Sequence, residues 1–80
     1  MIWYELWDMD LEMLMDEADD PALILDTLMV MAAETEPDER LNLLLIERHP
    51  ALQAESTFTG ADVLLQLEKR VAAQEARRQD

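Results

Sequence analysis

Two breaks marked by proline limit how this chain can fold, because they divide its 80 residues into three short segments. Asp19-Asp20-Pro21 predicts the start of a helix, since Asp20 can cap the first turn and proline suits the first helical position. The segment Thr35–Glu39, around Pro37, is typical of a polar loop. We therefore expect a helix from Pro21 to about Thr35. This helix is apolar on almost every side, which predicts that it is buried on more than one side or meets a partner.

The second half predicts a hairpin followed by a helix. Leu41–Glu47 is apolar on both faces and fits a central strand. His49-Pro50 ends it, because the residue before proline avoids the helical region. Glu55–Thr59 is rich in β-branched and aromatic residues and predicts a second strand, with a loop near Pro50–Gln53. Thr59-Gly60-Ala61-Asp62 matches a capping box, in which Thr59 caps and Asp62 reaches back, so we expect the last helix to follow Thr59. This helix has final residues expected to fray and carries an apolar stripe formed by Val63, Leu64, Leu67 and Val71.

The first twenty residues predict another hairpin. Ile2–Trp7 is aromatic and strand-like, Asp8–Asp10 fits a turn, and Leu11–Met15 fits a second strand. The resulting order is ββαββα, an α+β fold in which two helices cover a small antiparallel sheet. An all-α bundle of three or four helices is the alternative, since short apolar runs suit either structure.

Length and composition predict a single domain over residues 1–80. The chain has no cysteine, which excludes disulfides and thiolate sites. Its start lacks the basic region of a secretory signal, and its longest apolar run is about eight residues, whereas a bilayer-spanning helix needs about 20. We expect a cytoplasmic protein without a membrane partner.

Charge is distributed unevenly along the chain. Residues 1–39 hold thirteen of the 19 acids and no Lys, Arg or His, while the other six acids and all six bases follow. The formal net charge of -13 therefore comes from the first half. Such a field repels nucleic acid and anionic membranes and attracts basic surfaces.

Tyr4-Glu5-Leu6-Trp7-Asp8, opening a short acidic chain, resembles the first strand of a group of small acidic bacterial proteins without a known activity. Thr59-Gly60-Ala61-Asp62 stands where their last helix begins. The resemblance extends over most of the chain, rests on about nine residues and implies the same ββαββα order. These proteins usually have Gly-Asn after the first strand, where this chain has Asp10-Leu11-Glu12. The resemblance implies no activity, so no functional residue follows from it.

The acidic residues near the amino terminus are candidates for a recognition surface. A row of carboxylates can imitate the phosphates of DNA and compete for a basic groove. A solvated surface that aids solubility is the simpler interpretation. A calcium loop is not expected, because Met13 occupies the position that requires glycine when counted from Asp8. The candidate residues are Asp8, Asp10, Glu12, Asp16, Glu17, Asp19 and Asp20.

Trp3 and Trp7 share one face of the first predicted strand and flank Glu5. Core packing is the ordinary role of such residues. If helices instead cover the face of Ile2, Tyr4 and Leu6, the two indoles lie outside and become interface anchors.

A catalytic role is not expected. His49 is the only histidine, and Glu47 and Ser56 are its nearest partners in sequence, but the chain has no nucleophile elbow and only one glycine. We therefore predict a non-enzymatic adaptor or inhibitor, without cofactor or metal, that docks on a basic protein surface. A nucleic-acid mimic of phage or mobile-element type, directed at a nucleic-acid-binding protein, is one form. The alternative is an assembly protein that forms a homodimer through its apolar helix and Trp face.

Overall fold

The computed structural model describes residues 1–78 and has the predicted order ββαββα, which confirms the α+β fold. Four antiparallel strands form one sheet in the order β2-β1-β3-β4. The elements are β1 (Trp3–Asp8), β2 (Met13–Ala18), α1 (Pro21–Glu34), β3 (Leu43–His49), β4 (Ala54–Thr59) and α2 (Ala61–Arg78). A short 3-10 turn, Pro50–Leu52, joins β3 to β4.

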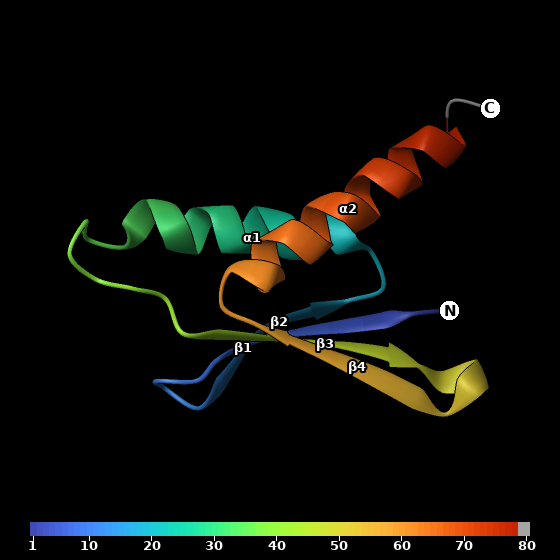
Figure 1. The fold of residues 1–80 in the computed structure, drawn as a ribbon, viewed down its shortest axis with the longest axis horizontal. Helices are drawn as coiled ribbons and strands as arrows, with labels where there is room; N and C mark the ends of the chain where they lie inside the picture. Colours follow the sequence, from blue (N-terminus) through green and yellow to red (C-terminus); the bar gives the residue numbers. More distant parts are fainter. Residues whose placement is uncertain (79–80) are drawn as a thin grey trace.

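Both helices lie on the same side of the sheet, so the molecule has two layers (Figure 1). The core lies between these layers. It is formed by alternate residues of the central strands, by the last residue of the edge strand β2 and by one stripe of each helix. Its members are Tyr4, Leu6, Ala18, Ile24, Leu28, Leu43, Leu45, Val63 and Leu67.

The first helix begins where the sequence predicts. The Asp20 carboxylate accepts a hydrogen bond from the Ala22 backbone N–H at 3.0 Å, and Pro21 occupies the first turn. Burial on several sides is not observed, however. Leu23, Met29 and Val30 are 53, 54 and 56% exposed, so the helix presents apolar surface to solvent.

The first hairpin turns later than expected. The Asp8 carboxylate accepts hydrogen bonds from the backbone N–H groups of Asp10 and Leu11, at 3.0 and 3.2 Å, and so stabilises a turn that extends through Glu12. Glu12 has a φ of 53°. Consequently β2 begins at Met13 rather than Leu11 and includes residues 16–18, with a register shift opposite Leu6 and Trp7.

The elements in the second half of the chain lie closer to their predicted bounds. The strand before His49-Pro50 starts two residues later than predicted, at Leu43, and β4 starts one residue earlier. The last helix begins at Ala61, one residue later than a Thr59 cap predicts, because Gly60 has a φ of +61° and lies outside the helix; it continues to Arg78. The fraying expected for the chain end falls partly on residues 79–80, which lie outside the described residues. Neither helix, over residues 1–78, is long and apolar enough to cross a membrane.

The two halves of the chain form two adjacent ββα units. The acidic first half supplies β1, β2 and α1, and the second half supplies β3, β4 and α2, with β1 and β3 paired at the centre. The uneven charge of the sequence therefore becomes an uneven charge across the width of the sheet.

Candidate functional site: the open face of the sheet

The side of the sheet opposite the helices is the open face. Tyr4 and Leu6 point into the core, so the alternating residues Trp3, Glu5 and Trp7 lie on the open face. The register adds residues from the other strands. They are Leu14 and Glu17 of β2, Leu44, Ile46 and Arg48 of β3, and Glu55, Thr57 and Thr59 of β4.

The centre of the open face is apolar. Trp7 pairs with Leu44, and Glu5 pairs with Ile46, so β1 and β3 place an indole and two aliphatic side chains next to one another. Trp3, Trp7, Leu44 and Ile46 are all half-buried and lie outside the core cluster. The helices cover the face of Tyr4 and Leu6, so neither tryptophan belongs to the core cluster, and their role as interface anchors stays a prediction.

A hydrogen-bond network orients the charged groups of this face. The Glu5 carboxylate accepts hydrogen bonds from the Trp7 indole N–H at 3.0 Å and from Arg48 Nε at 2.6 Å. Arg48 also donates to Glu55 at 2.6 Å. The hydrogen bond from Arg48 lowers the pKa of Glu5, so this carboxylate stays ionised. The hydrogen bond to Glu5 therefore orients the Trp7 indole on the open face.

The predicted acidic residues do not share one role. Three of them serve the fold: Asp8 holds the β1–β2 turn, Asp20 caps α1, and Asp16 accepts a hydrogen bond from the Thr27 hydroxyl at 2.5 Å. Asp10 also accepts a hydrogen bond, from Asn42 at 3.2 Å, although it remains exposed. Glu12, Glu17 and Asp19 are exposed as well.

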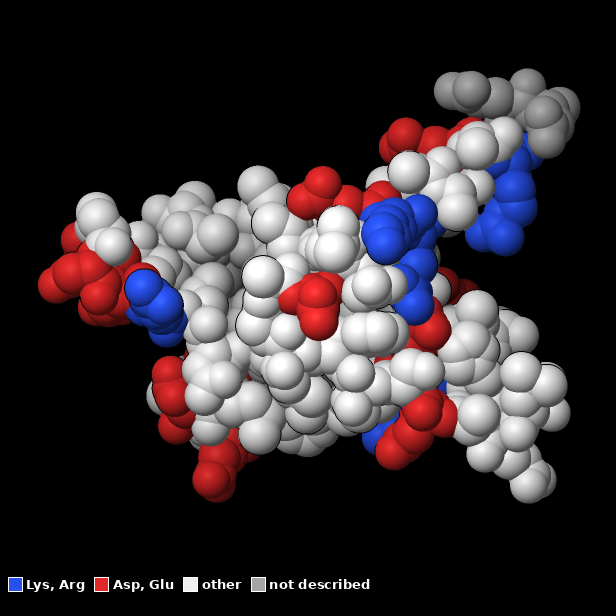
Figure 2. All heavy atoms as spheres, viewed as in Figure 1, with Lys and Arg blue, Asp and Glu red and all other residues white. Residues whose placement is uncertain are grey.

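The structure also separates these residues in space. Asp10 and Glu12 lie in the β1–β2 turn, whereas Asp19 and Asp20 follow the other end of β2. A six-residue strand is about 20 Å long, so the two ends form separate patches. Figure 2 shows acidic side chains at the β1–β2 turn and on the loop after α1, while most basic side chains lie on α2. Within the predicted set, Glu17 is the acid that joins Glu5 on the open face.

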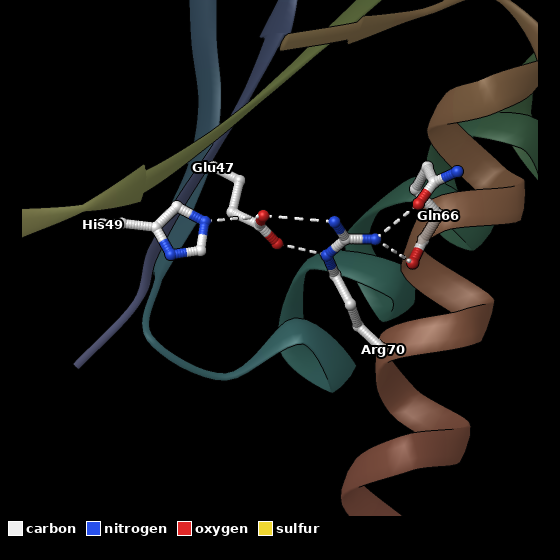
Figure 3. A network of polar contacts seen from close by, with 4 residues as sticks. All are labelled: Glu47, His49, Gln66 and Arg70. Carbon is white, nitrogen blue, oxygen red and sulfur yellow. Dashed lines mark hydrogen bonds and ion pairs between the residues drawn. The ribbon is translucent and has the colours of Figure 1, made fainter. Parts of the chain in front are cut away.

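The helix-covered side holds a buried ion pair that was not predicted from the sequence. Glu47 is 5% exposed and accepts two hydrogen bonds from the Arg70 guanidinium, while His49 Nε2 lies 2.8 Å from the same carboxylate (Figure 3). Arg70 also donates to the backbone carbonyl and the side chain of Gln66, at 3.0 and 2.7 Å. The hydrogen bonds from Arg70 lower the pKa of Glu47, and the pKa of Arg70 is raised in turn. This network attaches α2 to β3.

A cavity of about 400 Å³ borders this network; its lining includes His49, Asp19 and Arg77. Ser56 pairs with Glu47, whereas His49 pairs with Ala54. No hydrogen bond within residues 1–78 joins His49 to Ser56, so the residues considered for catalysis are not assembled into a nucleophile and base. In the same part of the chain, no group of three or more His, Asp or Glu residues is placed to hold a metal ion.

Comparisons of the chain with protein-family models, curated proteins and solved structures give no match. The function of this chain is therefore inferred from its own geometry. One signal in the sequence pointed to the buried ion pair: Glu47 continues the alternation of Leu43 and Leu45, so it occupies a core position and requires a cationic partner. The sequence left that partner open among six bases.

Proposed function

We propose that this chain is a non-enzymatic binding module whose open face docks on a protein surface that is apolar at its centre and basic at its rim. One observation carries the proposal: both tryptophans of the chain lie on the sheet face that no helix covers. Trp is enriched among the residues that dominate binding energy. A half-buried, preoriented indole such as Trp7 is suited to that role.

The charge around this face supports a basic partner. The open face carries three acids, Glu5, Glu17 and Glu55, and one base, Arg48, so its net charge is negative. The exposed acids of the β1–β2 turn extend this negative field beyond the open face. Long-range attraction of this kind accelerates association and weakens with salt. A nucleic-acid-binding protein of the cytoplasm fits these requirements, and the module would then act as an adaptor or as an inhibitor that imitates phosphates.

A second candidate function is favoured by α1. Leu23, Met29 and Val30 form exposed apolar surface on this helix. A chain that buried this surface against a second copy would be an assembly protein rather than a module for another partner. The two candidates use different surfaces, since the open face and α1 lie on opposite sides of the sheet.

The experiment is affinity capture from a lysate of the source cell, at low and at high salt. The unaltered chain is compared with a Trp3→Ser/Trp7→Ser variant and with a Leu23→Ser/Met29→Ser variant that alters α1 to a matched extent. We expect the unaltered chain and the α1 variant to capture a basic protein at low salt and less of it at high salt. The tryptophan variant should not capture this protein.

Two results would contradict this function. Capture of no basic protein at either salt concentration is one. The other is equal retention by the unaltered chain and the tryptophan variant. If only the α1 variant loses its partner, and that partner is the chain itself, the assembly function replaces the proposed one.

A further inference from the structure

The sheet has two edges, and they differ in how well they are protected. At the first edge, the pairing of β2 with β1 has a register shift, and the strand carries Asp16 and Glu17. Bulges and charges are devices that keep edge strands from pairing with other chains. The other edge is β4, which pairs with β3 over six consecutive residues without a shift. It contains no proline, glycine or lysine, and every residue except Phe58 is exposed.

The β4 edge also carries less net charge than the β2 edge. Glu55 is the one ionisable residue of β4, and it pairs at 2.6 Å with Arg48, which it shares with Glu5, whereas β2 carries Asp16 and Glu17 without a basic residue of its own. Residues 40–80 contain six acids and six bases, whereas residues 1–39 hold the whole net charge of -13. A second copy of this acidic chain would meet its own negative field at the β2 edge. At the β4 edge that repulsion is smallest.

From these two observations we infer that two copies of the chain pair antiparallel through β4, doubling the four-stranded sheet. The inference does not depend on the proposed function, because it concerns the backbone edge and not the open face. In an antiparallel pair of strands, residues directly opposite each other must have their side chains on the same face of the sheet. Thr57 lies on the open face with Ile46, and Ser56 lies on the helix side with Glu47. The registers that keep most of β4 paired therefore place Ser56 opposite Ser56 or Thr57 opposite Thr57.

This pairing has a consequence for binding. The twofold axis is perpendicular to the sheet, so both open faces look in the same direction and the two acidic halves lie at the far ends. Ser and Thr hydroxyls facing each other across strands are a favourable pair. A dimer of this form presents two pairs of tryptophans on one continuous surface. A partner with repeated sites would gain avidity without any new contact.

The test uses the absence of cysteine from the chain. Ser56→Cys and Thr57→Cys are made separately, with Met13→Cys on the exposed β2 edge as the matched control. Directly opposite residues of an antiparallel pair have Cβ atoms about 4.5–5.5 Å apart, close enough for a disulfide after a small adjustment. Under mild oxidation we expect one β4 variant to form a covalent dimer at least about tenfold faster than Met13→Cys.

Sedimentation equilibrium and amide hydrogen exchange of the unaltered chain complete the test, and they do not depend on the folding of any variant. We expect the mass to rise from 9.3 kDa toward twice that value with concentration, and the amides of β4 to gain protection in parallel. A chain that stays monomeric, or a dimer whose added protection falls on α1 or β2, overturns the inference. So does cross-linking of the β4 variants that is no faster than that of Met13→Cys. None of these results bears on capture through the tryptophans, so the two proposals fail separately.

Discussion

The two ββα halves of the molecule attach their helices to the shared sheet in different ways. In the first half, α1 packs through Ile24 and Leu28 and adds the hydrogen bond from Thr27 to Asp16. In the second half, α2 packs through Val63 and Leu67 and adds the buried ion pair of Arg70 with Glu47. A half without bases cannot neutralise a buried carboxylate, so its acids lie at the surface, cap a turn or helix, or pair across the sheet, as Glu5 does with Arg48.

The largest change in stability is expected when the ion pair of Arg70 with Glu47 is removed. Replacing Arg70 by Met leaves Glu47 charged and buried without its main partner, which we expect to cost about 3 kcal/mol or more of unfolding free energy. The double variant Arg70→Met/Glu47→Leu should recover most of that loss, because two apolar side chains replace the pair. Urea denaturation measures the unfolding free energy of the single and the double variant.

Arg77→Met is the control for this prediction, since Arg77 is exposed on the same helix. It should change stability by less than about 0.5 kcal/mol. An Arg70→Met variant as stable as Arg77→Met would mean that the network does not attach α2.

The next effect is a dependence on pH. Because the folded-state pKa of Glu47 lies below its ordinary value of 4.5, its contribution is complete above that value and is lost as pH falls through the folded-state pKa. We expect Glu47→Gln to be less stable than the unaltered chain by about 2 kcal/mol at pH 7, with this gap closing in acid. Urea denaturation of both proteins between pH 7 and pH 3 measures this difference in unfolding free energy. Glu75→Gln, at an exposed position of α2, serves as the control; a gap for Glu47→Gln that is constant with pH would contradict the assignment.

In the first half the corresponding effect is smaller. Asp16→Ala removes the acceptor for the Thr27 hydroxyl and should cost about 1 kcal/mol. Asp19→Ala, three residues away and exposed, is the matched control and should change stability by less than about 0.5 kcal/mol. Thermal unfolding monitored by circular dichroism compares them. Equal destabilisation would indicate that Asp16 does not link β2 to α1.

The smallest effect concerns the potential at the open face. All tryptophan emission comes from Trp3 and Trp7, so fluorescence reports this face alone. Because I⁻ is intrinsically the more efficient quencher of indole, the effect of each ion is expressed relative to its quenching of free N-acetyltryptophanamide. On that scale we expect Cs⁺ to quench the emission more strongly than I⁻ at low ionic strength, and the difference to shrink when salt screens the acids. Glu17→Gln should reduce the difference, whereas Glu75→Gln should not. On the same relative scale, stronger quenching by I⁻ would mean that the face is not negative.

The sequence predicted the main elements because their signals are local. Pro21 with Asp20 marked the start of α1, and His49-Pro50 marked the end of β3. The predicted start of β2 at Leu11 was wrong, because the Asp8 side chain, and not the alternation of Leu11, Met13 and Met15, determines where the turn ends.

The candidate site was harder to predict. Both faces of β1 carry large apolar side chains, so alternation grouped Trp3 with Trp7 without showing which face the helices cover. That choice depends on the packing of the whole sheet. Likewise, the acidic residues 8–20 are contiguous in sequence, yet the turn and β2 divide them between two ends of a hairpin.

The central claim is that the acids around the open face guide a basic partner toward the tryptophans. It is tested by the association rate of the captured protein with two variants that remove the same number of charges. One carries Asp10→Asn, Glu12→Gln and Glu17→Gln near the open face; the other carries Glu36→Gln, Asp38→Asn and Glu39→Gln on the loop after α1. The account predicts association about tenfold slower at low salt for the first variant and within about twofold of the unaltered chain for the second. Equal rates for the two variants would contradict it.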